Sequence, residues 1–483
     1  MNVYKRLLNA SLLSLLFFCG SCEDKGTGWT PDMIPDDPVI EEPEEEGEYH
    51  KYKAPLYWSV YEYCKKQEEA GNKKIDIAKG TWEDIIDFVA ENMKPYGFDM
   101  ICTDGFIAMD GTTEPDQYGY MTRYGDMRLD ELVAMCKAKG LKLGVYDNPL
   151  WVHGPHETLV KGTNVPLGDL LYKQGEDDVI YPEGTDGFPW LVASHKGSKE
   201  FIDGFFEYFK NMGVDYIRMD FLSWYEDGSD RYVGTVGRGY GREEYRLALK
   251  YICEAANKYG VFTSLVMPHL YEDAEIEKEY GHMVRIVSDT AMGGWEHFSR
   301  GSRGTVYDTW PNCMNMFDGF VHWSHISGRG KVIMDGDFTR LNTFNGEGEK
   351  QSVISLQLMA GGPIAITDMP GDSFSSNDLK YIQNKEILAL NSDGFVGKPL
   401  SDTGGSWNSK TQIWWGQMQN GDYVVGLFNR EDDKQNRTIE FKEIGIEGEM
   451  NVRDLWKQED EGKASKISID LEPRSCKIVK LAK

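Results

Sequence analysis

One unit recurs along most of this chain: a short apolar strand, a loop with polar and aromatic residues, and a helix whose apolar residues repeat every three or four positions. Strands are predicted at residues 54–61, 99–106, 142–148, 216–222, 261–267, 283–289, 331–338 and 363–369. Helices are predicted at 81–97, 128–139, 200–212, 242–259, 275–280, 310–326, 352–360 and 379–390. Eight such alternations are what a parallel (β/α)₈ barrel requires, so the sequence predicts a TIM barrel over residues 51–396.

A doubly wound open sheet is the competing arrangement for alternating strands and helices. That fold usually binds a nucleotide through a glycine-rich loop after the first strand, and no G-x-G-x-x-G or Walker-type loop follows residues 54–61. The barrel is therefore the favoured prediction, and no cofactor is expected.

The pattern changes beyond Gly397 to short strands of period two without helices. These strands are predicted at 412–419, 422–430, 438–441, 451–456, 467–471 and 476–479. Asn420 and Gly421 join the first two, and both residue types tolerate the positive φ of a type I′ hairpin turn. Residues 397–483 are thus expected to form a small antiparallel β-sandwich domain.

The first 50 residues are expected to serve in export and tethering and not to belong to the folded domains. Lys5 and Arg6 precede an apolar run at 7–18, and the following Cys19-Gly20-Ser21-Cys22 resembles a lipoprotein cleavage site. Residues 1–22 are expected to be a lipoprotein signal with Cys22 as the lipidated residue, although cleavage of an ordinary signal elsewhere is the alternative. Residues 23–50 are acidic and proline-rich, which predicts a solvated tether. The expected location is the outer membrane or cell surface of a Gram-negative bacterium, with membrane contact only through the lipid.

Charge and cysteine spacing narrow the set of partners. The formal net charge of -27 argues against nucleic acid, which proteins bind through Lys and Arg. His153 and His156 form a close histidine pair, but no H-x-H ends the first predicted strand and the six cysteines after the signal lack metal-ligand spacing, so no metal site is predicted. Cys64 and Cys102 fall near the ends of adjacent predicted strands, and a disulfide between them is left open.

Acidic residues gather where the predicted strands end, which is the active-site face of a TIM barrel. They are Asp104, Asp147, Asp220, Asp289, Asp335, Asp337 and Asp368. Asp220 ends the fourth strand and Asp289 the sixth, on opposite sides of the barrel mouth. Two facing carboxylates are what cleavage of a glycosidic bond requires, one to attack or orient water and one to protonate the leaving oxygen. The competing interpretation of Asp220 is a structural acid paired with Arg218.

Tryptophans also concentrate in the strand-end loops, where they are candidates for sugar-stacking platforms. They are Trp58, Trp151, Trp190, Trp224 and Trp295. For each one alone, packing in the core is the competing interpretation.

Several segments, taken in chain order, resemble the α-galactosidase (melibiase) group, which is glycoside hydrolase family 27 and its clan relatives. They are 55–58 (PLYW), 103–106 (TDGF), 141–146 (LKLGVY), 216–221 (YIRMDF), 284–289 (VRIVSD), and 362–364 (GPI) with 386–391 (EILALN). The resemblance runs from about residue 55 to the C-terminus.

This resemblance implies a retaining, exo-acting enzyme that acts on terminal α-galactosyl residues of a carbohydrate. Asp220 would be the nucleophile and Asp289 the acid/base, with their carboxyl groups roughly 5–5.5 Å apart. The substrate-binding residues implied are Trp58, Asp104, Tyr146, Arg218, Arg285 and Asp337.

The departures from the family pattern lie in the sugar pocket. Thr103 stands where the family has a second strand-two Asp, Arg218 replaces a Lys, Val266 stands near a usual acid, and 333–338 reads IMDGDF. These changes weaken the expectation of strict galactose specificity, so terminal α-galactose or the stereochemically related β-L-arabinopyranose, which lacks C6, is the expected sugar. Two rivals stay open: a calcium-assisted inverting α-glycosidase, and a non-catalytic carbohydrate-binding lipoprotein. Oligomeric state is not predicted.

Overall fold

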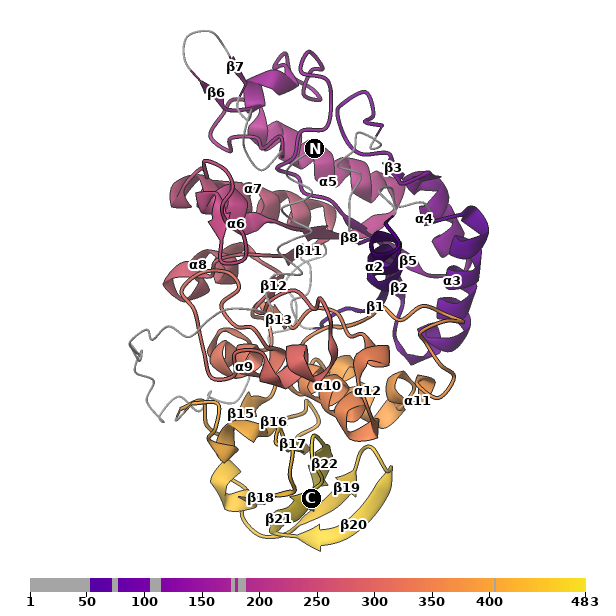
Figure 1. Ribbon diagram of the computed structural model, residues 1–483, viewed down its shortest axis with the longest axis vertical. Helices are drawn as coiled ribbons and strands as arrows, with labels where there is room; N and C mark the ends of the chain where they lie inside the picture. The colour runs from indigo at the N-terminus through magenta and orange to yellow at the C-terminus, as the bar shows by residue number, and fades with distance from the viewer. Residues whose placement is uncertain (1–52, 72–76, 105–113, 175–178, 181–187, 404) are drawn as a thin grey trace.

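The computed structural model describes residues 53–71, 77–104, 114–174, 179–180, 188–403 and 405–483 (Figure 1). The predicted signal segment, its lipidation site Cys22 and the acidic tether lie outside these residues and stay predictions. Within the described ranges, no helix has the length and apolar character needed to cross a membrane.

Eight parallel strands form a closed barrel at the centre of the larger domain (Figure 1). They are β1 (Leu56–Ser59), β2 (Met100–Cys102), β5 (Lys142–Tyr146), β8 (Val214–Met219), β11 (Phe262–Leu265), β12 (Met283–Arg285), β13 (Ile333–Asp335) and β14 (Ile364–Ile366). β1 pairs with both β2 and β14. The other edge closes just after β13, where Thr339 forms a parallel bridge to Ile366 and its amide donates to the Ala365 carbonyl at 2.8 Å. The predicted TIM barrel is confirmed.

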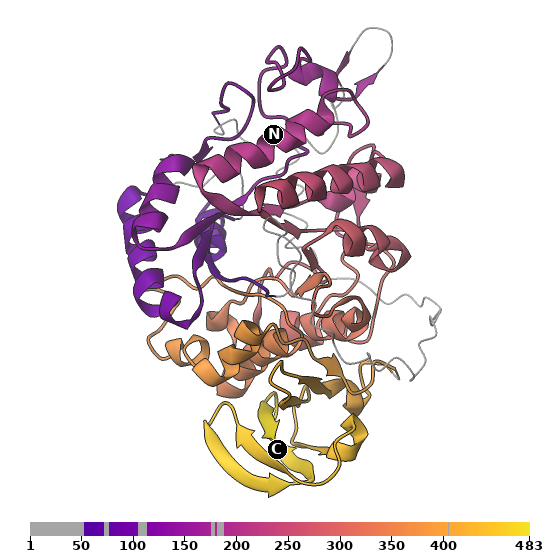
Figure 2. The ribbon, with the colours of Figure 1, turned by 180° about the vertical axis from the view of Figure 1, so that it is seen from behind.

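Helices surround the strands on the outside of the barrel (Figures 1 and 2). The α-helices are α2 (Tyr61–Glu69), α3 (Lys79–Asn92), α4 (Leu129–Ala138), α5 (Ser198–Met212), α6 (Leu222–Asp227), α7 (Arg242–Tyr259), α8 (Tyr271–Tyr280), α9 (Met316–His322), α10 (Glu347–Met359), α11 (Leu379–Ile382) and α12 (Lys385–Asp393). Shorter helical turns are η1 (Lys94–Tyr96), η2 (Leu167–Leu170), η4 (Ser324–Ile326), η5 (Leu341–Thr343) and the π-helix η3 (Glu296–Arg300). Two-residue strands pair in the loops as β3 (Arg123–Tyr124) with β4 (Met127–Arg128), β6 (Lys173–Gln174) with β7 (Val179–Ile180), and β9 (Ser229–Asp230) with β10 (Gly234–Thr235).

Two of the predicted helices are shorter or broken. The predicted helix at 310–326 begins only at Met316, because 310–315 is irregular chain. The predicted helix at 379–390 is split into α11 and α12, and the Asn384 side chain caps α12 by accepting from the amides of Glu386 and Ile387. Helix α2 begins at Tyr61, where the sequence pattern predicted the end of the first strand.

Alternation along the strands divides the barrel core into two layers. The inner layer fills the barrel with Tyr57, Met100, Cys102, Tyr216, Phe262, Met283, Ile333 and Ala365. The outer layer packs strand residues such as Leu56, Trp58 and Ile217 against the helices. Successive strand residues therefore face opposite environments, which decides whether a side chain can reach the barrel interior.

The C-terminal domain is a β-sandwich, as predicted. Its larger sheet has the order β15 (Lys398–Pro399), β16 (Ile413–Gln417), β17 (Tyr423–Phe428), β22 (Cys476–Ala482), β19 (Met450–Asp454) and β20 (Glu459–Ala464). The smaller sheet pairs β18 (Gln435–Glu440) with β21 (Lys466–Leu471), and the helical turns η6 (Ser409–Gln412) and η7 (Phe441–Ile444) complete the domain. One face of the larger sheet packs on the smaller sheet, and residues of its other face join the barrel core beside α10. In Figure 1 this domain is yellow and adjoins α9, α10 and α12.

Candidate active site

Asp220 lies immediately after β8, at the open end of the barrel. Tyr146, from the end of β5, donates its hydroxyl to Oδ2 of Asp220 at 2.7 Å, and the amide of Phe221 donates to Oδ1 at 2.7 Å. Asn148 donates its side-chain amide to the backbone carbonyl of Asp220 at 2.9 Å. Phe221 has a left-handed φ of 63°, a strained value for a bulky residue that is found mainly at functional sites. The local chain is thus built to hold one carboxylate in a fixed orientation.

The pKa of Asp220 is raised to about 6, chiefly by burial and then by the negative charge of Asp289. The hydrogen bond from Tyr146 acts in the opposite direction because it favours the ionised form. Asp289 therefore lies close enough for its charge to act on the pKa of Asp220, and Asp220 is ionised above about pH 6.

Asp289 lies four residues beyond β12, and 51% of its side-chain surface is exposed. Arg285 donates from Nη2 to Oδ1 of Asp289 at 2.6 Å. The same guanidinium is fixed from behind, because Nη1 donates to Asp337 at 2.8 Å and Nε donates to the Val287 carbonyl at 2.9 Å. The site therefore pairs a half-buried carboxylate with a solvent-accessible one that is held by a rigid arginine.

Arg218 is buried among three carboxylates and does not pair with Asp220. Its Nε lies 3.0 Å from Oδ2 of Asp104, Nη1 donates to Asp335 at 3.0 Å, and Nη2 donates to Asp337 at 2.9 Å. The guanidinium also lies 4.6 Å from the ring centroid of Phe338. The structural interpretation of Asp220 as a partner of Arg218 is therefore wrong, since the charge of Arg218 is balanced by other acids.

Asp337 holds Arg218 and Arg285 together beneath the site. Besides these two guanidinium groups, its carboxylate accepts from the amide of Thr290 at 2.6 Å and from the Thr290 hydroxyl at 2.8 Å. Burial alone would raise the pKa of Asp337, but the charges of Arg285 and Arg218 hold it below its ordinary value. Four donors saturate this carboxylate, so the structure gives no support to the predicted sugar contacts of Asp337 and Arg218, and a positioning role fits both better.

Trp58 points away from the barrel interior. It is fully buried in the outer layer, and its indole N–H donates to the Asp368 carbonyl at 2.9 Å. Because side chains alternate along the strand, the neighbouring Tyr57 lies in the barrel interior and Trp58 does not. The structure therefore gives no support to the predicted sugar contact of Trp58. Trp151, Trp190, Trp224 and Trp295 are also buried, so core packing, the competing interpretation, holds for all five.

Tyr61 and Tyr232 lie near Asp289 although the sequence did not single them out. The ring of Tyr61 stacks on Phe338 with centroids 4.7 Å apart. Burial and then the charge of Asp289 raise the pKa of both tyrosines above its ordinary range. Of these two tyrosines, only Tyr61 could have been found from the sequence, because it is an aromatic residue at the end of the predicted first strand.

Cys64 and Cys102 are free thiols in the structure. Sγ of Cys64 donates to the Asp104 carbonyl at 3.3 Å, and Sγ of Cys102 donates to the Thr103 carbonyl at 3.1 Å. Cys64 of α2 thus contacts the end of the strand that contains Cys102, and no disulfide joins the two. Within the described part of the chain, no group of three or more His, Cys, Asp and Glu side chains could hold a metal ion.

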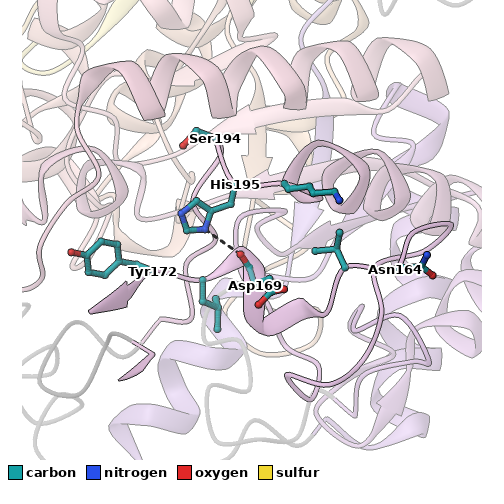
Figure 3. A pocket seen from close by; sticks show the side chains of 8 residues that line it. Asn164, Asp169, Tyr172, Ser194 and His195 are labelled. Carbon is teal, nitrogen blue, oxygen red and sulfur yellow. Dashed lines mark hydrogen bonds between the residues drawn. The ribbon is translucent and has the colours of Figure 1, made fainter. Parts of the chain in front are cut away.

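A separate cavity of about 570 Å³ lies in the long loop between β5 and α5 (Figure 3). Its lining residues are Asn164, Val165, Asp169, Leu171, Tyr172, Ser194, His195 and Lys196. Figure 3 shows Nδ1 of His195 pointing to the Asp169 carbonyl, at 3.2 Å. None of the predicted catalytic residues lines this cavity, so it is distinct from the carboxylate pair.

A closed (β/α)₈ barrel with two interacting carboxylates at its open end, followed by a β-sandwich, defines a glycoside hydrolase. The family of α-galactosidase C-terminal β-sandwich domains matches residues 408–481. The isomalto-dextranase of Arthrobacter globiformis is 38% identical over 442 residues, which cover 88% of this chain and 67% of the relative. The chain belongs to the α-galactosidase group, glycoside hydrolase family 27 and its clan relatives, as the sequence motifs indicated.

Solved structures agree on the architecture. The Arthrobacter globiformis isomalto-dextranase in complex with panose superposes with a TM-score of 0.80 at 36% identity, covering 92% of this chain and 76% of that one. A β-L-arabinopyranosidase of family 27 from Geobacillus stearothermophilus superposes with a TM-score of 0.66 at 19% identity, covering 90% and 98%. The second likeness is one of fold alone.

Proposed function

We propose that this protein is a retaining glycoside hydrolase that cleaves α-linked glucose chains of the isomalto-dextran type. The observation that carries the proposal is the 38% identity to an isomalto-dextranase along 88% of the chain, together with the TM-score of 0.80. Asp220 would act as the nucleophile, since it is ionised above about pH 6 and its second oxygen is oriented by Tyr146. Asp289 would protonate the leaving oxygen and then activate water, which its exposure permits.

The pocket supports a substrate other than galactose. Glucose and galactose differ only in the orientation of the C4 hydroxyl, which the family's paired strand-two acids would contact. Here Thr103 replaces one acid, and the other, Asp104, lies 3.0 Å from the buried guanidinium of Arg218. The family would bind the C4 hydroxyl of galactose with two carboxylates. This chain has only one carboxylate at these two positions, and it is paired with Arg218.

The proposal is tested by a substrate series that contains dextran, panose and the nitrophenyl glycosides of α-glucose, α-galactose and β-L-arabinopyranose. We expect the glucose substrates to be hydrolysed, with one short product from dextran and little loss of viscosity, as for an exo-acting enzyme. The first-formed anomer, followed by NMR, should keep its configuration. Asp220→Asn and Asp289→Asn should each lower kcat on the order of 10³-fold or more.

Three outcomes would contradict parts of this proposal. Cleavage of only the galactoside or the arabinopyranoside would refute the glucose substrate and restore the first expectation from the sequence. Inversion of the anomer would point to the calcium-assisted rival. Sugar binding without hydrolysis of any substrate would refute the enzyme and support the second rival, a non-catalytic carbohydrate-binding lipoprotein.

A further inference from the structure

Four large apolar side chains are exposed among the described residues. They are Leu159 (47% exposed), Met292 (69%), Val306 (44%) and Trp407 (70%). Met292 and Val306 belong to the β12–α9 loop, which carries Asp289, and Leu159 belongs to the β5–α5 loop. Trp407 lies in the segment before β16 that contacts the β12–α9 loop. Loops after parallel strands lie at the catalytic face, so Met292, Val306 and the contacting Trp407 form an exposed apolar group beside the loop that carries Asp289.

Trp407 is held rigidly although it is exposed. The guanidinium of Arg303 lies 3.8 Å from the centroid of its ring. Arg303 is itself fixed, because it donates twice to the carboxylate of Glu431, at 2.8 and 2.9 Å, and to the hydroxyl and carbonyl of Ser406, at 3.1 and 3.2 Å. Only 8% of the Arg303 side chain is exposed, so it backs one face of the indole and leaves the rest of the ring open to solvent. A ligand that stacks on this ring meets a preorganised surface.

Tyr307 repeats this arrangement closer to the catalytic carboxylates. The guanidinium of Arg231 lies 3.6 Å from its ring centroid. The hydroxyl of Tyr232, the next residue after Arg231, lies 4.0 Å from the sulfur of Met314, whose carbonyl accepts from the hydroxyl of Ser288, next to Asp289, at 3.1 Å. Four chain steps separate Tyr307 from Arg303, which limits their Cα atoms to about 14 Å apart. Tyr307 and Trp407 therefore lie beside the same short stretch of the β12–α9 loop, which also carries Asp289.

Close guanidinium backing of this kind occurs at three aromatic rings of the described chain. A third case is Tyr172, in the β5–α5 loop, with Arg238 at 3.6 Å. In the remaining cation–π contacts of the described chain, the cation lies 4.3 Å or more from the ring. Two of the three short contacts thus involve the β12–α9 loop that carries Asp289.

We propose that Trp407 and Tyr307, backed by Arg303 and Arg231, form a track that binds the distal units of a neutral polysaccharide whose end occupies the catalytic site. Sugar rings offer C–H faces that stack on aromatic rings, and spaced platforms suit a polymer better than a monosaccharide. The charge of Arg303 is neutralised by Glu431, and the net charge of -27 disfavours an anionic polymer. The choice of an α-glucan as ligand rests on the proposed function; the track itself does not.

The test uses the full chain carrying Asp220→Asn, so that binding is measured without hydrolysis. Affinity electrophoresis in gels with dextran, and separately with galactomannan, gives the dissociation constant for each polymer. Trp407→Ala should weaken binding about tenfold, the usual loss at an aromatic hot spot, whereas Trp407→Phe should retain most of it. Leu159→Ala, an exposed apolar residue outside the track, is the matched control and should bind like its parent. With Asp220 intact, Trp407→Ala should also lower the ratio of kcat/KM for dextran to that for panose about tenfold.

The outcomes separate the track from the proposed function. Loss of binding in Trp407→Ala on galactomannan but not on dextran would uphold the track and refute the glucan substrate. Equal binding of both polymers by Trp407→Ala, Trp407→Phe and the parent would overturn the track even if dextran is hydrolysed. Loss of binding in Leu159→Ala as large as in Trp407→Ala would also overturn it, since nonspecific apolar adhesion would then explain both.

Discussion

At the scale of single residues, this site is an arrangement of charges in which each acid has a different task. Asp337 accepts from four donors and holds Arg218 and Arg285 in place. Arg285 in turn fixes Asp289, while among the described residues the Asp220 carboxylate accepts only from the Tyr146 hydroxyl and one backbone amide. The pKa of Asp220 is raised, as expected where burial is not offset by a directly bound cation. A nucleophile must stay free of strong partners to react, and Asp220 meets this condition.

Tyr146→Phe tests the control of this carboxylate. An Asp220 nucleophile reacts only when ionised, so kcat/KM should fall as the pH drops below about 6. Removing the hydroxyl deletes a hydrogen bond that favours the ionised form, so the acid limb of the pH profile should move to higher pH. Tyr124→Phe is the matched control, because the Tyr124 hydroxyl donates to the Asp104 carbonyl and not to Asp220. A limb that stays in place in Tyr146→Phe, or moves equally in Tyr124→Phe, would contradict the assignment.

At the scale of elements, close packing of adjacent strands sets the positions of the site residues. Cys102, Gly144 and Tyr216 lie beside one another on β2, β5 and β8. A Cβ at Gly144 would meet Cδ1 of Tyr216 at 2.7 Å and the sulfur of Cys102 at 3.2 Å. Tyr146 lies two residues after Gly144 on β5, and Arg218 lies two residues after Tyr216 on β8. The glycine therefore allows the two strands that carry these site residues to pack closely together.

Gly144→Ala should destabilise the protein by about 1–3 kcal/mol through overpacking of the barrel interior. Gly80→Ala provides a control of opposite sign: Gly80 lies in α3 with no neighbour within 4 Å of the added carbon, and alanine should stabilise the helix by roughly 0.5–1 kcal/mol. Urea denaturation measures both changes. Equal stability of the two variants would show that the neighbouring side chains in the barrel interior can move to accommodate the added methyl group, which would contradict this prediction.

At the scale of the whole molecule, the C-terminal sandwich is fastened to the loop that carries Asp289. Arg430, from the sandwich, is fully buried and donates to Asp318 at 2.7 Å, to the Ser299 hydroxyl and carbonyl at 2.9 and 2.6 Å, and to Asn315 at 3.2 Å. On its other side, the adjoining 313–314 segment accepts from the amide and hydroxyl of Ser288, next to Asp289. The sandwich therefore supports the catalytic loop from outside.

Arg430→Met should cost about 3–5 kcal/mol of stability, because it leaves the buried carboxylate of Asp318 without its charged partner. Arg300→Met is the matched control: Arg300 also crosses between the domains, to Asp432, but both side chains are about half exposed, and at most about 1 kcal/mol should be lost. Thermal unfolding of the two variants compares them directly. Similar losses would indicate that apolar packing against α10, not this buried pair, holds the domains together.

The sequence by itself determined the architecture and the two acids at its mouth. Strand and helix periodicities are local, so eight alternations followed by period-two strands were sufficient to predict the barrel and the sandwich. The in-order motifs placed the chain in its family, and the position of Asp220 and Asp289 after strands four and six brought them to one face.

Tertiary structure decided the role of the neighbouring side chains. The partners of Arg218 come from β2 and from the end of β13, more than 100 residues away along the chain, so sequence could not distinguish a sugar-binding arginine from one enclosed by acids. The same limit applies to the tryptophans: five in strand-end loops are buried, while Trp407, in a segment without a motif, is exposed. Residue type and spacing predict where a strand ends, but burial depends on which distant elements pack over the side chain, and only the fold specifies these.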